Sequence, residues 1–142
     1  MKETLCTVCG VAGAFIAKLF GGWDAALTTL VIFMVIDYIT GMLVAAVFRK
    51  SEKTESGALG SRAGLIGLCR KGVIMLVVLV ASRLDITVGS TFIKDATVIA
   101  FIVNETISII ENAALMGIPI PAPIKHSIDI LRKKGAEDNT SK

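Results

Sequence analysis

Five polar residues lie close together in the stretch from Asp95 to Pro121, which is otherwise strongly apolar and long enough to cross a bilayer. At roughly 100° per residue they fall on one side of a helix. These residues are Asn104, Glu105, Ser108, Glu111 and Asn112. Carboxylates are costly at bilayer depth, so a stripe of this kind faces water or pairs with polar groups of another helix.

A second apolar segment carries one acidic residue at its centre. Residues 25–48 form the strongest spanning candidate by length, with Asp37 in the middle. A carboxylate there costs roughly 2.5–3.5 kcal/mol on insertion scales, so we expect Asp37 to be protonated, paired or water-facing. Thr40 and Gly41 share its face, and a small residue lets a neighbouring backbone come close. A functional role and a purely structural hydrogen bond between helices both remain open for Asp37.

The sequence offers no constellation typical of catalysis. Cys6 and Cys9 form a CxxC in an apolar segment, Cys69 is distant, and His126 is the single histidine. A zinc or redox site would need further ligands, so we expect the cysteines to act as small apolar side chains. We find no nucleophile–base pair and no phosphate-binding loop, and we predict neither an enzyme nor a cofactor.

Composition indicates an all-α integral membrane protein. The chain has 142 residues, of which 54% are hydrophobic, and its mean hydropathy is +0.73. A soluble chain of this size cannot bury so much apolar surface. The net charge of +3 is small, and its basic residues form no folded surface of the kind that binds nucleic acid.

We predict three to four transmembrane helices followed by a short amphipathic helix on the membrane surface. The predicted spans are about 5–22, 25–48, 65–82 and 95–117. The alternative for the first is a helix that lies in the membrane interface. Prolines end the fourth span, and residues 122–134 form the surface helix. Residues 1–134 are thus a single membrane domain, and 135–142 are expected to be a polar, disordered tail.

Basic residues gather in two segments, which the positive-inside rule places on the cytoplasmic side together with the C-terminus. They are Arg49, Lys50, Lys53, Arg62, Arg70, Lys71, Arg132, Lys133 and Lys134. Arg83 and Asp85 are predicted to mark the opposite face, with 86–94 as the outer connection.

Three motifs resemble the toxin-secretion/phage-lysis holin family, in the right order over roughly residues 23–133. They are WDAALTTLVIFMVIDYITGML (23–43), SRAGLIGLCRKG (61–72) and NETISIIENAALMGIPIP (104–121). The resemblance implies a small protein that accumulates in the bacterial cytoplasmic membrane and oligomerises. It then opens lesions that release a cell-wall-degrading endolysin or, in some relatives, a large toxin.

The resemblance carries over no catalytic residue. The matching positions are the DYITG residues Asp37, Tyr38, Thr40 and Gly41, together with the polar stripe of the fourth span. The implied partners are the lipid bilayer, further copies of the chain, the released protein and an antiholin. Some holins make an inhibitor form from two nearby start codons. Here the next methionine after Met1 is Met34, which disfavours that route.

The polar faces suggest a mechanism as a hypothesis. In dispersed copies they pair with one another, and in an oligomer they turn toward a shared aqueous lumen. Two other classes fit the helices. A small four-helix proton-coupled transporter would also place a carboxylate mid-membrane, but Trp23 and Tyr38 alone do not make an aromatic pocket. A non-catalytic membrane adaptor would use residues 135–142 as its contact.

Overall fold

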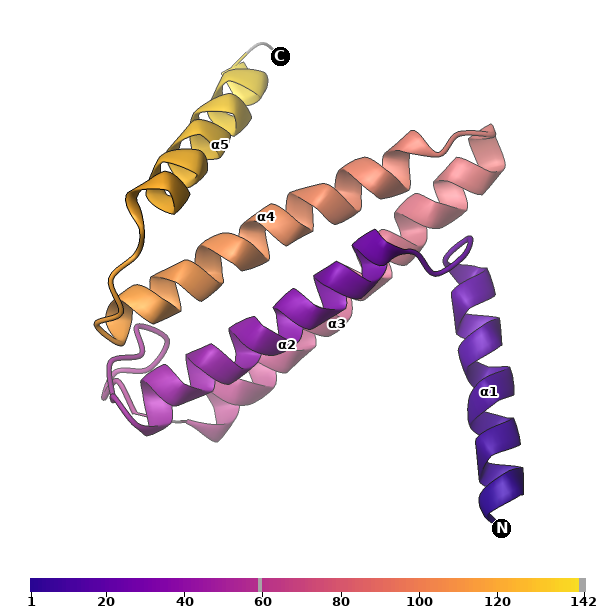
Figure 1. Cartoon of the computed structure of the whole chain (residues 1–142), viewed down its shortest axis with the longest axis horizontal. Helices are drawn as coiled ribbons and strands as arrows, with labels where there is room; N and C mark the ends of the chain where they lie inside the picture. Colours follow the sequence, from indigo (N-terminus) through magenta and orange to yellow (C-terminus); the bar gives the residue numbers. More distant parts are fainter. Residues whose placement is uncertain (59, 141–142) are drawn as a thin grey trace.

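Five α-helices form the chain in the computed structural model, which describes residues 1–58 and 60–140 (Figure 1). They are α1 (Lys2–Leu19), α2 (Ala25–Ala46), α3 (Ser61–Val88), α4 (Phe92–Leu115) and α5 (Ala122–Thr140). The described residues contain no strand, which confirms the predicted all-α class. Within α5, the side chains of residues 131, 132 and 134–140 lie outside the described part.

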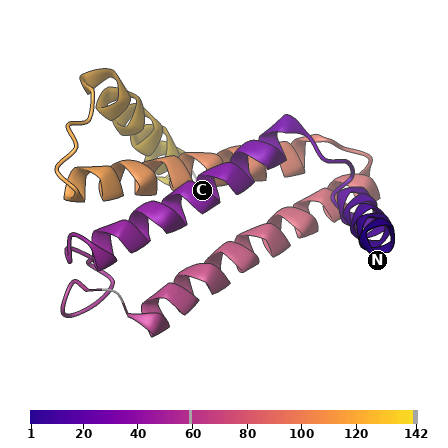
Figure 2. The ribbon, with the colours of Figure 1, turned by 60° about the horizontal axis from the view of Figure 1, so that its bottom comes forward.

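The bundle consists of α2, α3 and α4 (Figures 1 and 2). α2 packs along α4 in the same direction, and α3 runs the opposite way, with more contact to α4 than to α2. Apolar side chains fill the half of the bundle next to the α3–α4 connection. Leu27, Leu30, Met34, Val78 and Val98 are buried there. The other half, toward the α2–α3 connection, holds the buried polar residues Asp37, Glu105 and Asn112.

The three bundle helices are long and apolar enough to cross a membrane, which agrees with the three-span form of the prediction. α1 does not meet that criterion within the described residues. The outer surface of the bundle carries large apolar side chains such as Val35, Ile39, Leu76 and Val80. Lipid tails are as apolar as these side chains, so this surface is suited to a bilayer.

α1 stands apart from the bundle. None of its residues is buried, and Figure 2 shows it nearly end-on while the bundle lies across the view. The chain turns from α1 into α2 through Gly21 and Gly22, whose φ angles are 71° and 107°. A Cβ at Gly21 would lie 3.1 Å from the Ser82 hydroxyl, so a side chain at this turn would be strained and crowded.

α3 is longer than the predicted span of 65–82. It begins at Ser61 and continues past Arg83 to Val88, where Gly89 adopts a left-handed conformation with a φ of 71°. The outer connection is therefore short, and most of the predicted connection at 86–94 is helical. The reason is that Asp85 uses its buried carboxylate to cap the next helix, rather than facing solvent in a loop.

The other bounds differ less, except at the C-terminus. α2 and α4 lie within three residues of the predicted 25–48 and 95–117. α5 continues to Thr140 and so includes most of the predicted tail, while 141–142 lie outside the described residues. The α2–α3 and α4–α5 connections lie at the same end of the bundle (Figure 1), so both basic segments begin there. Which side of the membrane that end faces stays a prediction.

Candidate functional site

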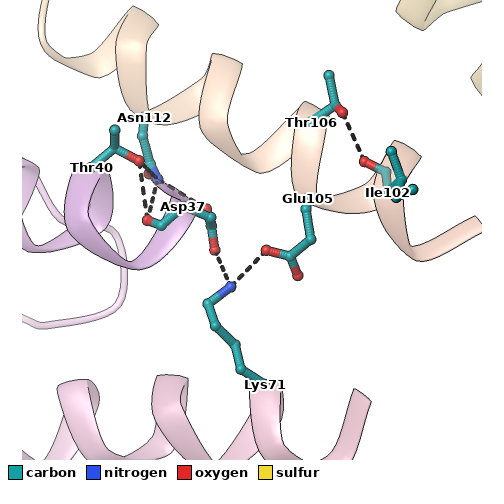
Figure 3. A network of polar contacts seen from close by, with 7 residues as sticks. All are labelled: Asp37, Thr40, Lys71, Ile102, Glu105, Thr106 and Asn112. Carbon is teal, nitrogen blue, oxygen red and sulfur yellow. Dashed lines mark hydrogen bonds and ion pairs between the residues drawn. The ribbon is translucent and has the colours of Figure 1, made fainter. Parts of the chain in front are cut away.

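One lysine joins the three spanning helices inside the bundle (Figure 3). The Lys71 ammonium lies 2.6 Å from a carboxylate oxygen of Asp37 and 2.6 Å from one of Glu105. The two acids are only 7% and 3% exposed. Each helix contributes one member of this triad: Asp37 from α2, Lys71 from α3 and Glu105 from α4. A shared cation holds the two like-charged carboxylates close together, which they would otherwise resist.

Helix geometry sets the triad at a common depth. Asp37 lies nine residues before the end of α2, Glu105 ten before the end of α4, and Lys71 ten after the start of α3. At roughly 1.5 Å per residue, these positions are about 14–15 Å from the end with the α2–α3 connection. A hydrocarbon core is about 30 Å thick, so the triad lies near its centre when the bundle spans it.

Asn112 extends the triad by joining α4 to α2. Its amide nitrogen donates to an Asp37 carboxylate oxygen at 3.1 Å and to the Thr40 hydroxyl at 3.0 Å. A Cβ at Gly41 would lie 3.7 Å from the same nitrogen, an ordinary van der Waals distance, so Gly41 lies directly beside this amide. The structure therefore brings together five of the residues singled out in the sequence. They are Asp37, Thr40, Gly41, Glu105 and Asn112.

A cavity of about 610 Å³ lies beside the triad between the three helices. The remaining polar-stripe residues of α4, Asn104, Ser108 and Glu111, line it, and so does the connection at residues 51–54. Asn104 and Glu111 are exposed at the cavity rim, as is Arg70 of α3. The predicted stripe is thus divided between a closed network and an open rim.

Two glycines of α3 lie against Tyr38 of α2 beside the cavity. The Tyr38 hydroxyl donates to the backbone carbonyl of Gly64 at 3.3 Å. A Cβ at Gly67 would lie 3.7 Å from the Tyr38 ring. Sequence reasoning did not single out Gly64 and Gly67. Their spacing after Gly60, at four and seven residues, was the signal that one face of α3 is small.

The predicted basic segments are placed as follows. Exposed side chains surround the end of the bundle that holds the α2–α3 connection: Arg49, Lys50, Lys53 and Arg62. Lys133 is exposed on α5, whereas the side chains of Arg132 and Lys134 lie outside the described residues. Lys71 differs from all of these because its ammonium is part of the triad.

A second polar cluster lies at the opposite end. Asp85 accepts the backbone N–H groups of Ile93 at 3.0 Å and Lys94 at 2.8 Å, which caps the start of α4. The Lys94 ammonium reaches an Asp24 carboxylate oxygen at 3.0 Å and the carbonyl of Gly22 at 3.2 Å. Asp24 caps α2 by accepting the Leu27 N–H at 2.8 Å, and this bond, with the Lys94 ammonium, lowers the pKa of Asp24.

The described residues hold no group of three or more acidic, histidine or cysteine side chains arranged for a metal ion. Cys6, Cys9 and Cys69 are free and exposed. The charged groups of the triad lie beside a cavity, so they can bind water in place of one another.

A model of the bacteriophage holin family matches residues 14–133. The chain belongs to this family. A probable holin of Bacillus phage phi105 is 34% identical to the chain over 74% of its length and 73% of the phage protein. An uncharacterized protein of Halalkalibacterium halodurans is 38% identical over 93% and 96%. An uncharacterized 14.9 kDa protein in the nagH 3′ region of Clostridium perfringens is 38% identical over 86% and 88%. No solved structure matches.

Membership in the holin family fits the architecture. The three apolar helices and the family together indicate a protein of the cytoplasmic membrane. The family suggests a non-enzymatic membrane protein and implies homo-oligomer behaviour. The triad therefore has to be explained in a protein whose surroundings are lipid and other copies of itself.

Proposed function

We propose that this holin-family chain oligomerises in the bacterial cytoplasmic membrane and opens lesions through which an endolysin or a toxin leaves the cytoplasm. The observation that carries the proposal is the triad, because it supplies each copy with three formal charges near the bilayer centre. A protein that only needs to span lipid has no use for such charges, which are costly to insert.

In a single copy the triad keeps the bundle closed. Lys71 neutralises one carboxylate and hydrogen-bonds both, so α3 is tied to α2 and α4 at the level where apolar packing gives way to the cavity. Copies in this state can accumulate in the membrane without passing ions, because the charged groups satisfy one another.

In an oligomer the same groups can bind water instead of one another. A shared lumen lets the carboxylates and the ammonium hydrate, which relieves the cost of their burial. With all three groups ionised, the triad carries one net negative charge, so it responds to the membrane potential. A unit charge that crosses the whole field gains about 2.3 kcal/mol per 100 mV. Depolarisation by the first lesions then shifts the equilibrium between the closed bundle and the lumen-forming oligomer in neighbouring copies.

Induced expression in bacteria with a potential-sensitive dye tests the proposal, with and without an endolysin in the cytoplasm. We expect a sudden depolarisation in both cultures and lysis only in the culture that contains the endolysin. A proton-gradient-dependent efflux of a solute with the potential intact would contradict the proposal and support a transporter.

The lumen has a test of its own. Glu105→Leu together with Glu111→Leu removes two acids from the face that would be hydrated, so we expect protein that inserts but does not depolarise the cell. Val103→Leu together with Ile110→Leu changes two apolar positions of the same helix and serves as the control. Depolarisation on schedule by the double leucine variant of the acids would show that these residues do not line the lumen.

A further inference from the structure

Two polar side chains at the cavity rim, Asn104 and Arg70, lie at the depth of the triad. Asn104 and Arg70 are exposed and directly precede Glu105 and Lys71, so their Cα atoms differ from the triad in depth by only about 1.5 Å. Neither side chain takes part in a hydrogen bond or an ion pair within the described part of the chain.

Lipid is an unsuitable neighbour for this rim. An amide that moves from water into an environment that cannot hydrogen-bond loses its hydration without compensation, and an arginine at the centre of a span is costly to insert. The opposite surface of the bundle differs, because exposed apolar residues such as Val35 and Ile39 cover it at the same depth. One face of the bundle thus suits lipid and the other does not.

A second copy of the chain suits the rim. A carboxamide carries both a donor and an acceptor, so two asparagines related by a two-fold axis satisfy each other. Amide hydrogen bonds of this kind stabilise helix association in membranes. Such a contact would also bring Arg70 of one copy near the cavity of the other, where the ionised triad carries one net negative charge. Both the hydrogen-bonding groups and the charges of the rim are therefore self-complementary.

We propose that the face carrying Asn104 and Arg70 is where two copies of this chain meet in the membrane, with the Asn104 amides paired across the contact. The inference rests on the membrane insertion and self-association in the proposed function, and it does not require a lesion to form.

Cross-linking at a neighbouring position tests the contact while Asn104 is kept. Cys6, Cys9 and Cys69 are exposed and are first changed to serine. Ala100 is exposed and lies one turn before Asn104 on α4, so Ala100→Cys places a thiol beside the proposed contact. Ile39→Cys is the matched control, because Ile39 is 52% exposed and lies two residues from Asp37 on the lipid-suited face.

A short bismaleimide applied to membranes should give a covalent dimer with Ala100→Cys and none with Ile39→Cys, at equal amounts of inserted protein. Adding Asn104→Leu to the Ala100→Cys variant should reduce the dimer several-fold, whereas Asn104→Gln should retain it. Equal cross-linking at both positions, or a dimer that Asn104→Leu leaves unchanged, would overturn the proposal. So would reaction of Ala100→Cys with a membrane-impermeant maleimide in the absence of any dimer, since the rim would then face water.

Dye measurements on the same cultures keep this test separate from the lesion. A dimer without depolarisation would leave the contact in place and contradict the proposed function. Depolarisation by a variant that gives no dimer would contradict the contact alone.

Discussion

The two lysine-centred clusters use similar groups in different surroundings. Lys94 joins Asp24 near the helix starts, where both Asp24 and Asp85 accept backbone N–H groups that no helix carbonyl can reach. Lys71 joins Asp37 and Glu105 in the middle of helices, where the backbone N–H groups already bond within the helix. The end cluster therefore stabilises helix ends even without its lysine, whereas the central carboxylates depend on Lys71 and on Asn112.

Lys71→Met should have the largest effect. It leaves two carboxylates together near the bilayer centre without their cation, and breaking a buried ion pair in this way costs about 3–5 kcal/mol in soluble proteins. We expect the closed bundle to be destabilised and depolarisation to begin earlier after induction. The dye assay measures the onset, with the amount of inserted protein held equal.

The matched variant for this comparison is Lys71→Met combined with Asp37→Asn and Glu105→Gln. This variant removes all three charges at once, and uncharged replacements of a buried ionic network are often tolerated. Depolarisation by this variant should begin later than depolarisation by Lys71→Met alone. If Lys71→Met depolarises cells at the same time as the wild type, the triad does not hold the bundle closed.

Asp85→Ala should destabilise the folded protein without changing the onset of depolarisation. The substitution removes the acceptor of two backbone N–H groups at the start of α4, and loss of a side chain that caps a helix start costs about 0.5–2 kcal/mol. Asp85→Asn retains a capping oxygen and should lose less stability than Asp85→Ala. Unfolding of the purified protein in mixed micelles measures the free energy of unfolding of each variant. An earlier onset in either variant would show that the end cluster also controls opening.

Asp24 predicts a small pH dependence confined to the end cluster. Its pKa lies below the ordinary value of 3.8. The stabilisation from its ionised form is therefore complete above about pH 4 and is lost as the pH falls through the folded-state pKa. Because the side chain is 45% exposed, we expect less than about 1 kcal/mol. The unfolding free energies of the wild type and Asp24→Asn should converge as the pH falls through the folded-state pKa of Asp24. A constant difference would contradict this.

Thr40→Val should have the smallest effect. It removes one acceptor of the Asn112 amide but leaves the bond from that amide to Asp37. Hydrogen bonds between membrane helices average about 0.6 kcal/mol, and we expect a loss of that order in the micelle unfolding assay. Thr29→Val is the control, because the Thr29 hydroxyl donates only to the carbonyl of Ala25 in its own helix. Equal losses in the two variants would show that the Asn112 contact contributes nothing.

The sequence predicted the acidic and amide residues of the site better than its lysine. Asp37, Glu105 and Asn112 stand out because acidic and amide groups are rare in apolar spans, and helical spacing puts them on defined faces. Lys71 does not stand out, because it follows Arg70 next to a basic loop, where charge counting assigns any lysine to the cytoplasmic side.

The distance from the connection between helices was the overlooked signal. Asp37 and Lys71 lie almost equally far from the α2–α3 connection, so antiparallel pairing brings them to one level. Assigning Lys71 to the interior also requires that α3 start well before it. The sequence left that start uncertain, because Gly60, Gly64 and Gly67 weaken the helical pattern. Burial of Asp85 was missed for a similar reason, since a charged residue at the end of a span predicts a membrane boundary.

The order of synthesis gives the triad a further consequence. Asp37 precedes Lys71 by 34 residues, and Lys71 precedes Glu105 by 34 residues. At about 5–20 residues per second, a ribosome needs roughly 2–7 s for each interval. The Asp37 carboxylate therefore leaves the ribosome well before Lys71 is made. Until α3 arrives, the nascent chain must keep Asp37 in the translocon or in protonated form.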